Sequence, residues 1–204
     1  SEPEPVRETL YMLGISEGED SWTFDNHLRL YDEDNLGYAG VADVNSPWGY
    51  QIAIEDGNWG DVYKLGEGDA NAGTLAFGTE NNIPAPDGGL YFFDVSLKAL
   101  TYKLTALGSE IYVAGLNKLE DETWTFEPLP AATTAGVFSG SITITQPSAW
   151  GFKIYLFDNN WDYVYGGNGG KLYYKGNGIT DDATLAPGTY TLTVDLIHET
   201  YTIE

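Results

Sequence analysis

The six tryptophans of the chain form two sets of three with the same spacing, which indicates a tandem repeat. Trp22, Trp48 and Trp59 recur 102 positions later as Trp124, Trp150 and Trp161. Neighbouring residues match in the same register, since SPWGYQIAIEDGNWGDVY recurs as SAWGFKIYLFDNNWDYVY. A period of about 100 residues is too long for a solenoid but is the usual size of a small domain. We therefore expect two copies of one domain.

The repeat predicts the domain boundaries within the 204 residues. Copy one is expected over residues 9–107 and copy two over residues 108–204. The opening segment SEPEPVRE, residues 1–8, is acidic and stiffened by proline, and is typical of a linker. We expect it to follow a removed N-terminal region, which could be a signal, an anchor or another domain.

Short strand-like segments separated by turn residues predict an all-β fold of two tandem β-sandwich domains of the immunoglobulin-like kind. LYMLG and IYVAG are apolar runs ended by glycine, and YQIAIE and FKIYLF alternate with a period of two. TYTLTV and HETYTIE form a closing hairpin that turns near His198–Glu199. SLKAL could be helical by itself, but its alignment with this hairpin favours strands.

The charge of the chain excludes several classes of partner. It has 31 acidic residues against 9 Lys and Arg, a net charge of −22. Such a charge repels the phosphates of nucleic acids and opposes binding to anionic membrane surfaces. The absence of cysteine excludes disulfides, thiolate metal sites and a cysteine nucleophile. No apolar run approaches the ~20 residues that span a membrane.

Motifs of catalysis and metal binding are absent from the sequence. It contains no Gly-x-Ser-x-Gly, no His-Glu-x-x-His and no phosphate-binding glycine loop. YDEDN and EDGNWGD are similar to calcium loops but lack their full spacing, so a calcium site stays open. The acids are too numerous for any pair to indicate a glycosidase. We expect no enzymatic activity and no cofactor.

The order of motifs in each copy resembles the tandem carbohydrate-binding modules of SusE/SusF-like outer-membrane lipoproteins. The order is a strand ending in glycine, a tryptophan, a strand such as GFK, W-x-x-x-Y-G, an Asn-bearing loop, G-x-Y and a V-D hairpin. Copy two matches better, because copy one has VYKLG where the pattern has Tyr-Gly. The resemblance implies carbohydrate-binding-module-like sandwiches that capture starch or a related glycan at the cell surface. It also implies a lipid anchor absent from this chain and an outer-membrane uptake porin as a partner.

Strand periodicity separates core positions from candidate surface positions in copy two. Phe152, Ile154 and Leu156 share one face of GFKIYLF and are expected in the core, because the aligned face of copy one is also apolar. Lys153, Tyr155 and Phe157 take the other face. If DNNWDYVYGG is extended, Trp161, Tyr163 and Tyr165 share a face as well.

An exposed aromatic face suits a sugar, because the C–H faces of a pyranose stack on aromatic rings while its hydroxyls need hydrogen bonds. Trp161 is the expected central residue, although its match with Trp59 leaves a core role open; Trp22 and Trp124 are expected to pack. The predicted carbohydrate-binding residues are Trp161, Tyr155, Lys153, Tyr163, Trp150, Asn168, Asn177, Trp59 and Trp48. The alternatives are a structural or protein-interaction module of an uptake complex and a glycoside hydrolase.

Overall fold

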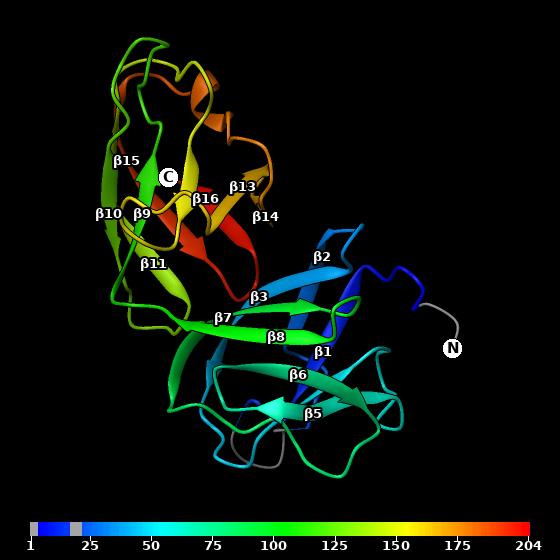
Figure 1. The fold of residues 1–204 in the computed structure, drawn as a ribbon. Helices are drawn as coiled ribbons and strands as arrows, with labels where there is room; N and C mark the ends of the chain where they lie inside the picture. Colours follow the sequence, from blue (N-terminus) through cyan, green and yellow to red (C-terminus); the bar gives the residue numbers. More distant parts are fainter. Residues whose placement is uncertain (1–3, 17–21) are drawn as a thin grey trace. The chain divides into compact units, whose positions relative to one another are not determined.

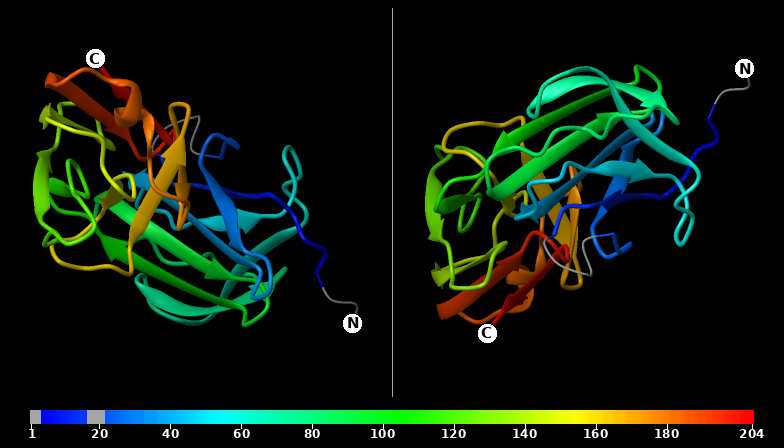
Figure 2. Two further views of the ribbon diagram at one scale, coloured as in Figure 1. Left: turned by 90° about the horizontal axis from the view of Figure 1, so that it is seen from above. Right: turned by 90° about the horizontal axis from the view of Figure 1, so that it is seen from below.

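The computed structural model describes residues 4–16 and 22–204 and confirms the all-β prediction (Figure 1). Strands and loops make up the described residues of both units in every view of Figures 1 and 2, apart from a short 3-10 helix, Asp181–Thr184. The chain divides into two compact units, unit 1 (Ser1–Ala106) and unit 2 (Leu107–Glu204).

Unit 1 is a closed antiparallel barrel with the strand order β1-β2-β3-β7-β8-β6-β5-β4. Its strands are β1 (Thr9–Leu13), β2 (His27–Asp32), β3 (Gly37–Val44), β4 (Gln51–Ala53), β5 (Val62–Gly68), β6 (Ala72–Phe77), β7 (Gly89–Ser96) and β8 (Thr101–Ala106). SLKAL contains the last residue of β7 and the turn that leads to its partner strand β8. The expectation that this segment belongs to a pair of strands and is not a helix is confirmed.

Unit 2 is an 8-stranded sheet with the order β10-β9-β12-β13-β14-β16-β15-β11. Its strands are β9 (Glu110–Ala114), β10 (Phe126–Pro130), β11 (Val137–Ile144), β12 (Lys153–Tyr155), β13 (Val164–Asn168), β14 (Lys171–Tyr174), β15 (Gly188–Asp195) and β16 (Thr200–Ile203). Strand for strand, this is the path of unit 1, with β9 in the place of β1 and β16 in the place of β8. The repeat in the sequence is therefore a repeat of topology.

Two prolines explain why unit 2 lacks the continuous ladder that closes unit 1. Ala131 donates its N–H to Ser109 O at 2.8 Å. Because the backbone groups of an antiparallel strand point alternately to its two neighbours, the other odd-numbered residues of this segment also direct their N–H and C=O groups toward β9. Pro128 and Pro130 then face β11, where they have no N–H to donate. Just after β10, Ala131 forms an isolated bridge with Phe138 of β11 in place of a continuous ladder. In unit 1, the corresponding strand β2 has no proline and pairs with β3.

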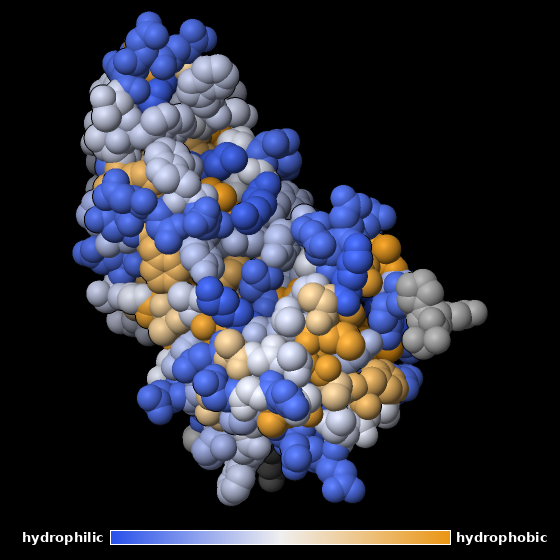
Figure 3. All heavy atoms as spheres, in the orientation of Figure 1, coloured by the Kyte–Doolittle hydropathy of each residue, from blue (hydrophilic) through white to orange (hydrophobic). Residues whose placement is uncertain are grey.

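The core of each unit comes from one face of each strand. Phe152, Ile154 and Leu156 are all buried, which confirms the periodicity argument for that face. The equivalent residues Tyr50, Ile52 and Ile54 of unit 1 are buried too. Hydrophilic residues are spread across the face of the molecule shown in Figure 3, as the dispersed acids of the sequence lead us to expect.

Candidate functional site

Four aromatic side chains gather on the outer surface of unit 2 and form what we call the Trp161 patch: Trp124, Phe126, Tyr155 and Trp161. The Trp161 ring lies edge-on to the other three rings, with centroid distances of 5.5 Å to Trp124, 5.0 Å to Phe126 and 5.3 Å to Tyr155. Phe126 and Tyr155 also contact each other at 4.8 Å. Trp161 nevertheless remains 50% exposed. It is both a packed residue and a surface residue.

The β12–β13 loop places Trp161 over this cluster. Asn160 accepts a hydrogen bond from the N–H of Asp162 at 2.9 Å through its side chain, which closes a local turn around the tryptophan. Asn159 supplies the positive φ of 51° that the turn requires, a conformation that asparagine tolerates. The loop is closed where Leu156 N–H donates to Tyr163 O at 3.0 Å. The sequence Asn-Asn-Trp thus fixes the position of the ring.

The same loop recurs in unit 1 with Gly57 and Asn58 before Trp59. Gly57 has a φ of 76°, and the Asn58 side chain accepts the N–H of Gly60 at 2.9 Å. Trp59 is 60% exposed and contacts Phe24 edge-on at 5.0 Å. Its indole N–H donates to Trp22 O at 3.1 Å. A smaller aromatic patch therefore occupies the same place, with Ala53 where unit 2 has Tyr155.

The patches differ in the hydrogen-bonding capacity that they leave open. Within the part of the chain that the structure describes, the indole N–H of Trp161 has no hydrogen-bond partner, whereas the indole N–H of Trp59 donates to Trp22 O. Burial raises the pKa of the Tyr155 hydroxyl, so this residue stays neutral at physiological pH. The Trp161 patch is therefore an uncharged aromatic surface that includes the free N–H of Trp161.

The prediction that Tyr155 lies on an exposed face is wrong. Tyr155 is 4% exposed, because Trp161 and Phe126 cover its ring. The alternation of β12 does put it on the outer face, but a second aromatic layer buries that face. Its place is under Trp161, where it supports the ring.

The prediction that Trp161, Tyr163 and Tyr165 share one extended face is also wrong. β13 begins at Val164, and the residues before it follow the turn of the loop. Tyr163 therefore packs edge-on against Phe157 at 5.2 Å, outside the Trp161 patch. Tyr165 is buried and packs against Tyr174 at 5.2 Å. Tyr63, which matches Tyr165 in unit 1, is buried as well, so the shared tyrosine belongs to the fold.

Lys153 lies at the border of the Trp161 patch. It is half-buried and lies on the same face of β12 as Tyr155. Its strand partner in β9 is Ala114, which packs with Tyr155 in one hydrophobic cluster. Among the described residues its ammonium has no ion pair or hydrogen bond. Lys153 is therefore a half-buried cation on the β12 face that carries Tyr155.

Trp150 and Asn177 form a second group of predicted residues at the other end of β12. Trp150 is 59% exposed, and a Cβ on Gly178 would come within 2.4 Å of its carbonyl oxygen, so the two loops touch through their backbones. Asn177 precedes Gly178 and is exposed. In unit 1, Trp48 occupies the equivalent loop and is 75% exposed.

Asn168 is not brought to either group. It ends β13 at the tip of the hairpin to β14, four residues and about 13 Å of strand beyond Val164. Gly166 and Gly167, which follow Tyr165 and are special to copy two, are buried and structural. A Cβ on Gly166 would lie 2.0 Å from Asn177 O, because the loop after β14 crosses directly over it.

Two contributors were not predicted from the sequence. Trp124 was expected only to pack, but it is partly exposed and forms one side of the Trp161 patch. Phe126 was not singled out, although it contacts both Tyr155 and Trp161. The signal was available in the repeated WTF, which places a tryptophan and a phenylalanine two residues apart in both copies.

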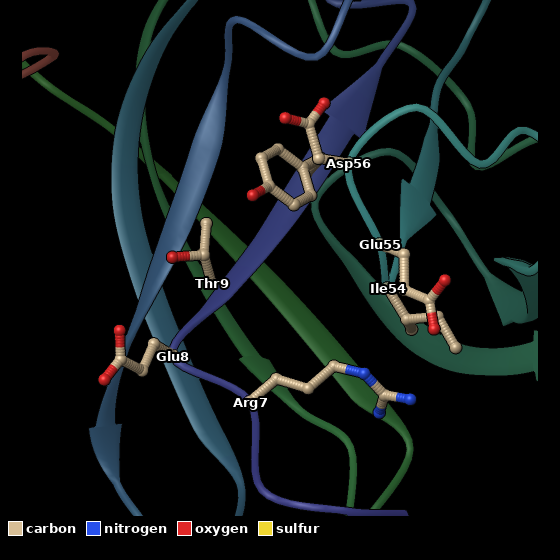
Figure 4. Close-up of a pocket in the computed structure, with 7 residues that line it drawn as sticks. Arg7, Glu8, Thr9, Ile54, Glu55 and Asp56 are labelled. Carbon is tan, nitrogen blue, oxygen red and sulfur yellow. The ribbon is translucent and has the colours of Figure 1, made fainter.

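Unit 1 also has an open groove of about 440 Å³ beside its aromatic patch (Figure 4). It is lined by Arg7, Glu8, Thr9, Tyr11, Ile54, Glu55 and Asp56. Figure 4 shows the Arg7 side chain extending toward the wall that carries Ile54 and Glu55. The Arg7 guanidinium is paired with Glu4 at 2.7 Å, so the groove presents mainly carboxylates.

Two other kinds of feature are absent from the described residues. No group of three or more His, Cys, Asp or Glu side chains within residues 4–16 and 22–204 could hold a metal ion. In the same ranges, the structure has no helix of the length and hydrophobicity that crossing a membrane requires.

Comparison with known proteins gives two similarities. Residues 8–106 match a family model described as a domain of unknown function, DUF8037. A solved structure titled "Crystal Structure of SusF from Bacteroides thetaiotaomicron" is 17% identical with a TM-score of 0.37. That match covers 100% of this chain and 50% of the SusF chain, so the chain spans half its length. No curated protein matches.

Proposed function

We propose that this chain is a non-catalytic polysaccharide-binding protein and that the Trp161 patch is its main site. The observation that carries the proposal is the state of Trp161, a half-exposed ring held edge-on against three others. The ligand class follows from the chemistry that such a ring can offer.

A pyranose ring gains from this surface in two ways. Its C–H face removes apolar area from water on the indole, at about 25 cal/mol per Å². A pre-positioned aromatic ring loses little conformational entropy on binding. The free Trp161 N–H and the unpaired Lys153 ammonium can then donate to hydroxyls at the ring edge, whose desolvation would otherwise cost about 1–3 kcal/mol each.

The biological setting of the proposal comes from the sequence resemblance to SusE/SusF-like lipoproteins. We propose starch or a related glycan as the ligand and the outer-membrane cell surface as the location, with a lipid anchor in the full-length protein. An uptake porin is the proposed partner. The exposed Trp48 and Trp59 make unit 1 a candidate for a second contact with the same polymer.

Replacing Trp161 by alanine tests the proposal. A glycan array first identifies a polysaccharide that the parent binds, and affinity electrophoresis in gels containing it then gives the dissociation constant. We expect Trp161→Ala to bind about tenfold more weakly or worse, as the loss of ~1.5 kcal/mol of stacking implies.

Tyr173→Ala is the matched control, because Tyr173 is an exposed aromatic residue of unit 2 outside the patch. It should bind like the parent. A folded Trp161→Ala protein with unchanged affinity would show that the site is elsewhere. Failure of the parent to bind any glycan would favour a protein-interaction module, and new reducing ends after overnight incubation would indicate a hydrolase.

A further inference from the structure

Lys118, in the loop between β9 and β10, is a buried charge without a counter-ion. Its side chain is 6% exposed, and among the described residues it makes no ion pair. The ammonium donates to Leu119 O at 2.9 Å and, more weakly, to Glu120 O at 3.5 Å. Burying an ammonium is costly, and an apolar side chain of the same size is often at least as stable. Stability alone therefore does not explain a lysine at this position.

The Lys118 side chain touches the Trp161 patch. Its Nζ lies 4.5 Å from the centroid of the Trp124 ring, a cation–π contact. A desolvated contact of this kind is stronger than an exposed one and orients the ring that it covers. Trp124 in turn packs edge-on against Trp161 at 5.5 Å. The Trp124 ring thus lies between the ammonium of Lys118 and Trp161, the proposed stacking residue.

The Lys118 backbone holds the loop that carries the exposed Trp150. Its carbonyl accepts the N–H of Ala149 at 2.8 Å, immediately before Trp150. The preceding Asn117 ties the same two loops together, because its side chain donates to Thr143 O at 2.7 Å and accepts from Thr145 N–H at 2.8 Å. One short segment therefore fixes both Trp124 and Trp150.

Unit 1 lacks the corresponding hydrogen bond. Pro47 stands in the place of Ala149 and has no N–H, and the loop is held instead by the N–H groups of Asn45 and Ser46, which donate to Ile15 O at 3.1 and 3.2 Å. Proline at this position is thus compatible with the fold, but the link between the two loops differs between the units.

We propose that Lys118 is a positioning residue for glycan binding, which orients Trp124 through its ammonium and Trp150 through its backbone carbonyl. The inference rests on the proposed function of the Trp161 patch. It makes the geometry of Trp124, in the Trp161 patch, and of Trp150, in the second group, depend on one buried residue between their loops. Lys118 acts before binding, by reducing the freedom of the rings that the sugar meets.

Lys118→Met tests the side-chain contact in the full chain. Methionine preserves length and apolar contact but removes the charge, and the carbonyls of the exposed residues Leu119 and Glu120 can turn to water. We expect an unfolding midpoint close to that of the parent and about fivefold weaker binding to the array-selected glycan. The indole N–H resonance of Trp124 should shift in a ¹H–¹⁵N spectrum without ligand, and Lys118→Arg should restore much of the affinity.

Ala149→Pro tests the backbone contact independently and stays informative if Lys118→Met fails to fold. It introduces the residue that unit 1 already carries, so we expect a folded protein in which the Trp150 indole resonance moves and affinity falls about threefold. Pro47→Ala in unit 1 is the matched control and should leave the Trp150 indole resonance unchanged.

The outcomes separate this inference from the proposed function. If the parent binds no glycan, the proposed function fails. If the parent binds and Trp161→Ala does not, but folded Lys118→Met or Ala149→Pro binds like the parent with unmoved indole resonances, the positioning role is overturned. Weaker binding with shifted indole resonances in both variants supports it.

Discussion

At the scale of single residues, the two units differ at a buried hydroxyl. Tyr50 lies in the core of unit 1, and within the described part of the chain its hydroxyl has no hydrogen-bond partner. Phe152 fills the equivalent position in unit 2 and buries no polar atom. An unsatisfied buried hydroxyl costs about 1–3 kcal/mol, so the tyrosine is a local weakness of unit 1.

Tyr50→Phe should therefore raise the free energy of unfolding of unit 1 by about 1 kcal/mol near neutral pH. Burial raises the pKa of Tyr50 well above its usual value of 10.0, so the folded parent holds this proton more tightly than the unfolded chain. The stability of the parent must then fall as pH rises above about 10, where the unfolded tyrosine ionises. We expect the advantage of the variant to grow in that range, as measured by urea denaturation at several pH values.

Tyr91→Phe is the control for this substitution. The Tyr91 hydroxyl donates to Asp87 O at 2.8 Å, so its removal breaks a satisfied hydrogen bond and should lower stability. Equal effects of the two substitutions would mean that the Tyr50 hydroxyl has a partner in solution.

At the scale of elements, strand β13 depends on the close approach of a neighbouring loop. Gly166 and Gly167 replace Lys64 and Leu65 of the aligned strand β5. Their missing side chains let the segment after β14 lie across the strand, where Gly167 N–H donates to Asn177 O at 2.9 Å. The same segment touches Trp150 through Gly178, so the glycines contribute to the site through the fold.

Gly166→Ala should destabilise unit 2 by more than about 2 kcal/mol, because the new methyl would meet Asn177 O at 2.0 Å and the strand must move. Gly188→Ala in β15 is the control, since the nearest atom to its Cβ would be 3.7 Å away, an ordinary contact. Calorimetry of the two variants gives the comparison. A Gly166→Ala protein as stable as Gly188→Ala would contradict the close approach.

At the scale of the whole molecule, charge is the dominant feature. A net charge of −22 destabilises the compact state through self-repulsion, while the dispersed acids keep the surface hydrophilic (Figure 3). No binding or packing feature of the Trp161 patch uses these acids. Stability and glycan binding should therefore respond differently to salt.

Raising NaCl from about 10 mM to about 150 mM shortens the Debye length from roughly 30 Å to roughly 8 Å. We expect the melting temperature to rise over this range, while the dissociation constant for a neutral glycan stays within about twofold because stacking is uncharged. Thermal denaturation and affinity electrophoresis at both salt concentrations provide the measurements. A steep loss of affinity in salt would indicate that Lys153 binds an anionic group.

The sequence by itself determined the all-β class, the repeat and the core face of β12, because these follow from spacing and alternation along the chain. It also indicated Trp161, through its place in the repeat. Only the tertiary structure decided that Tyr155 is buried, that Tyr163 lies outside the patch and that Trp124 and Phe126 belong to it. Alternation assigns a residue to a face, but a second layer of side chains from a distant loop decides whether that face meets water.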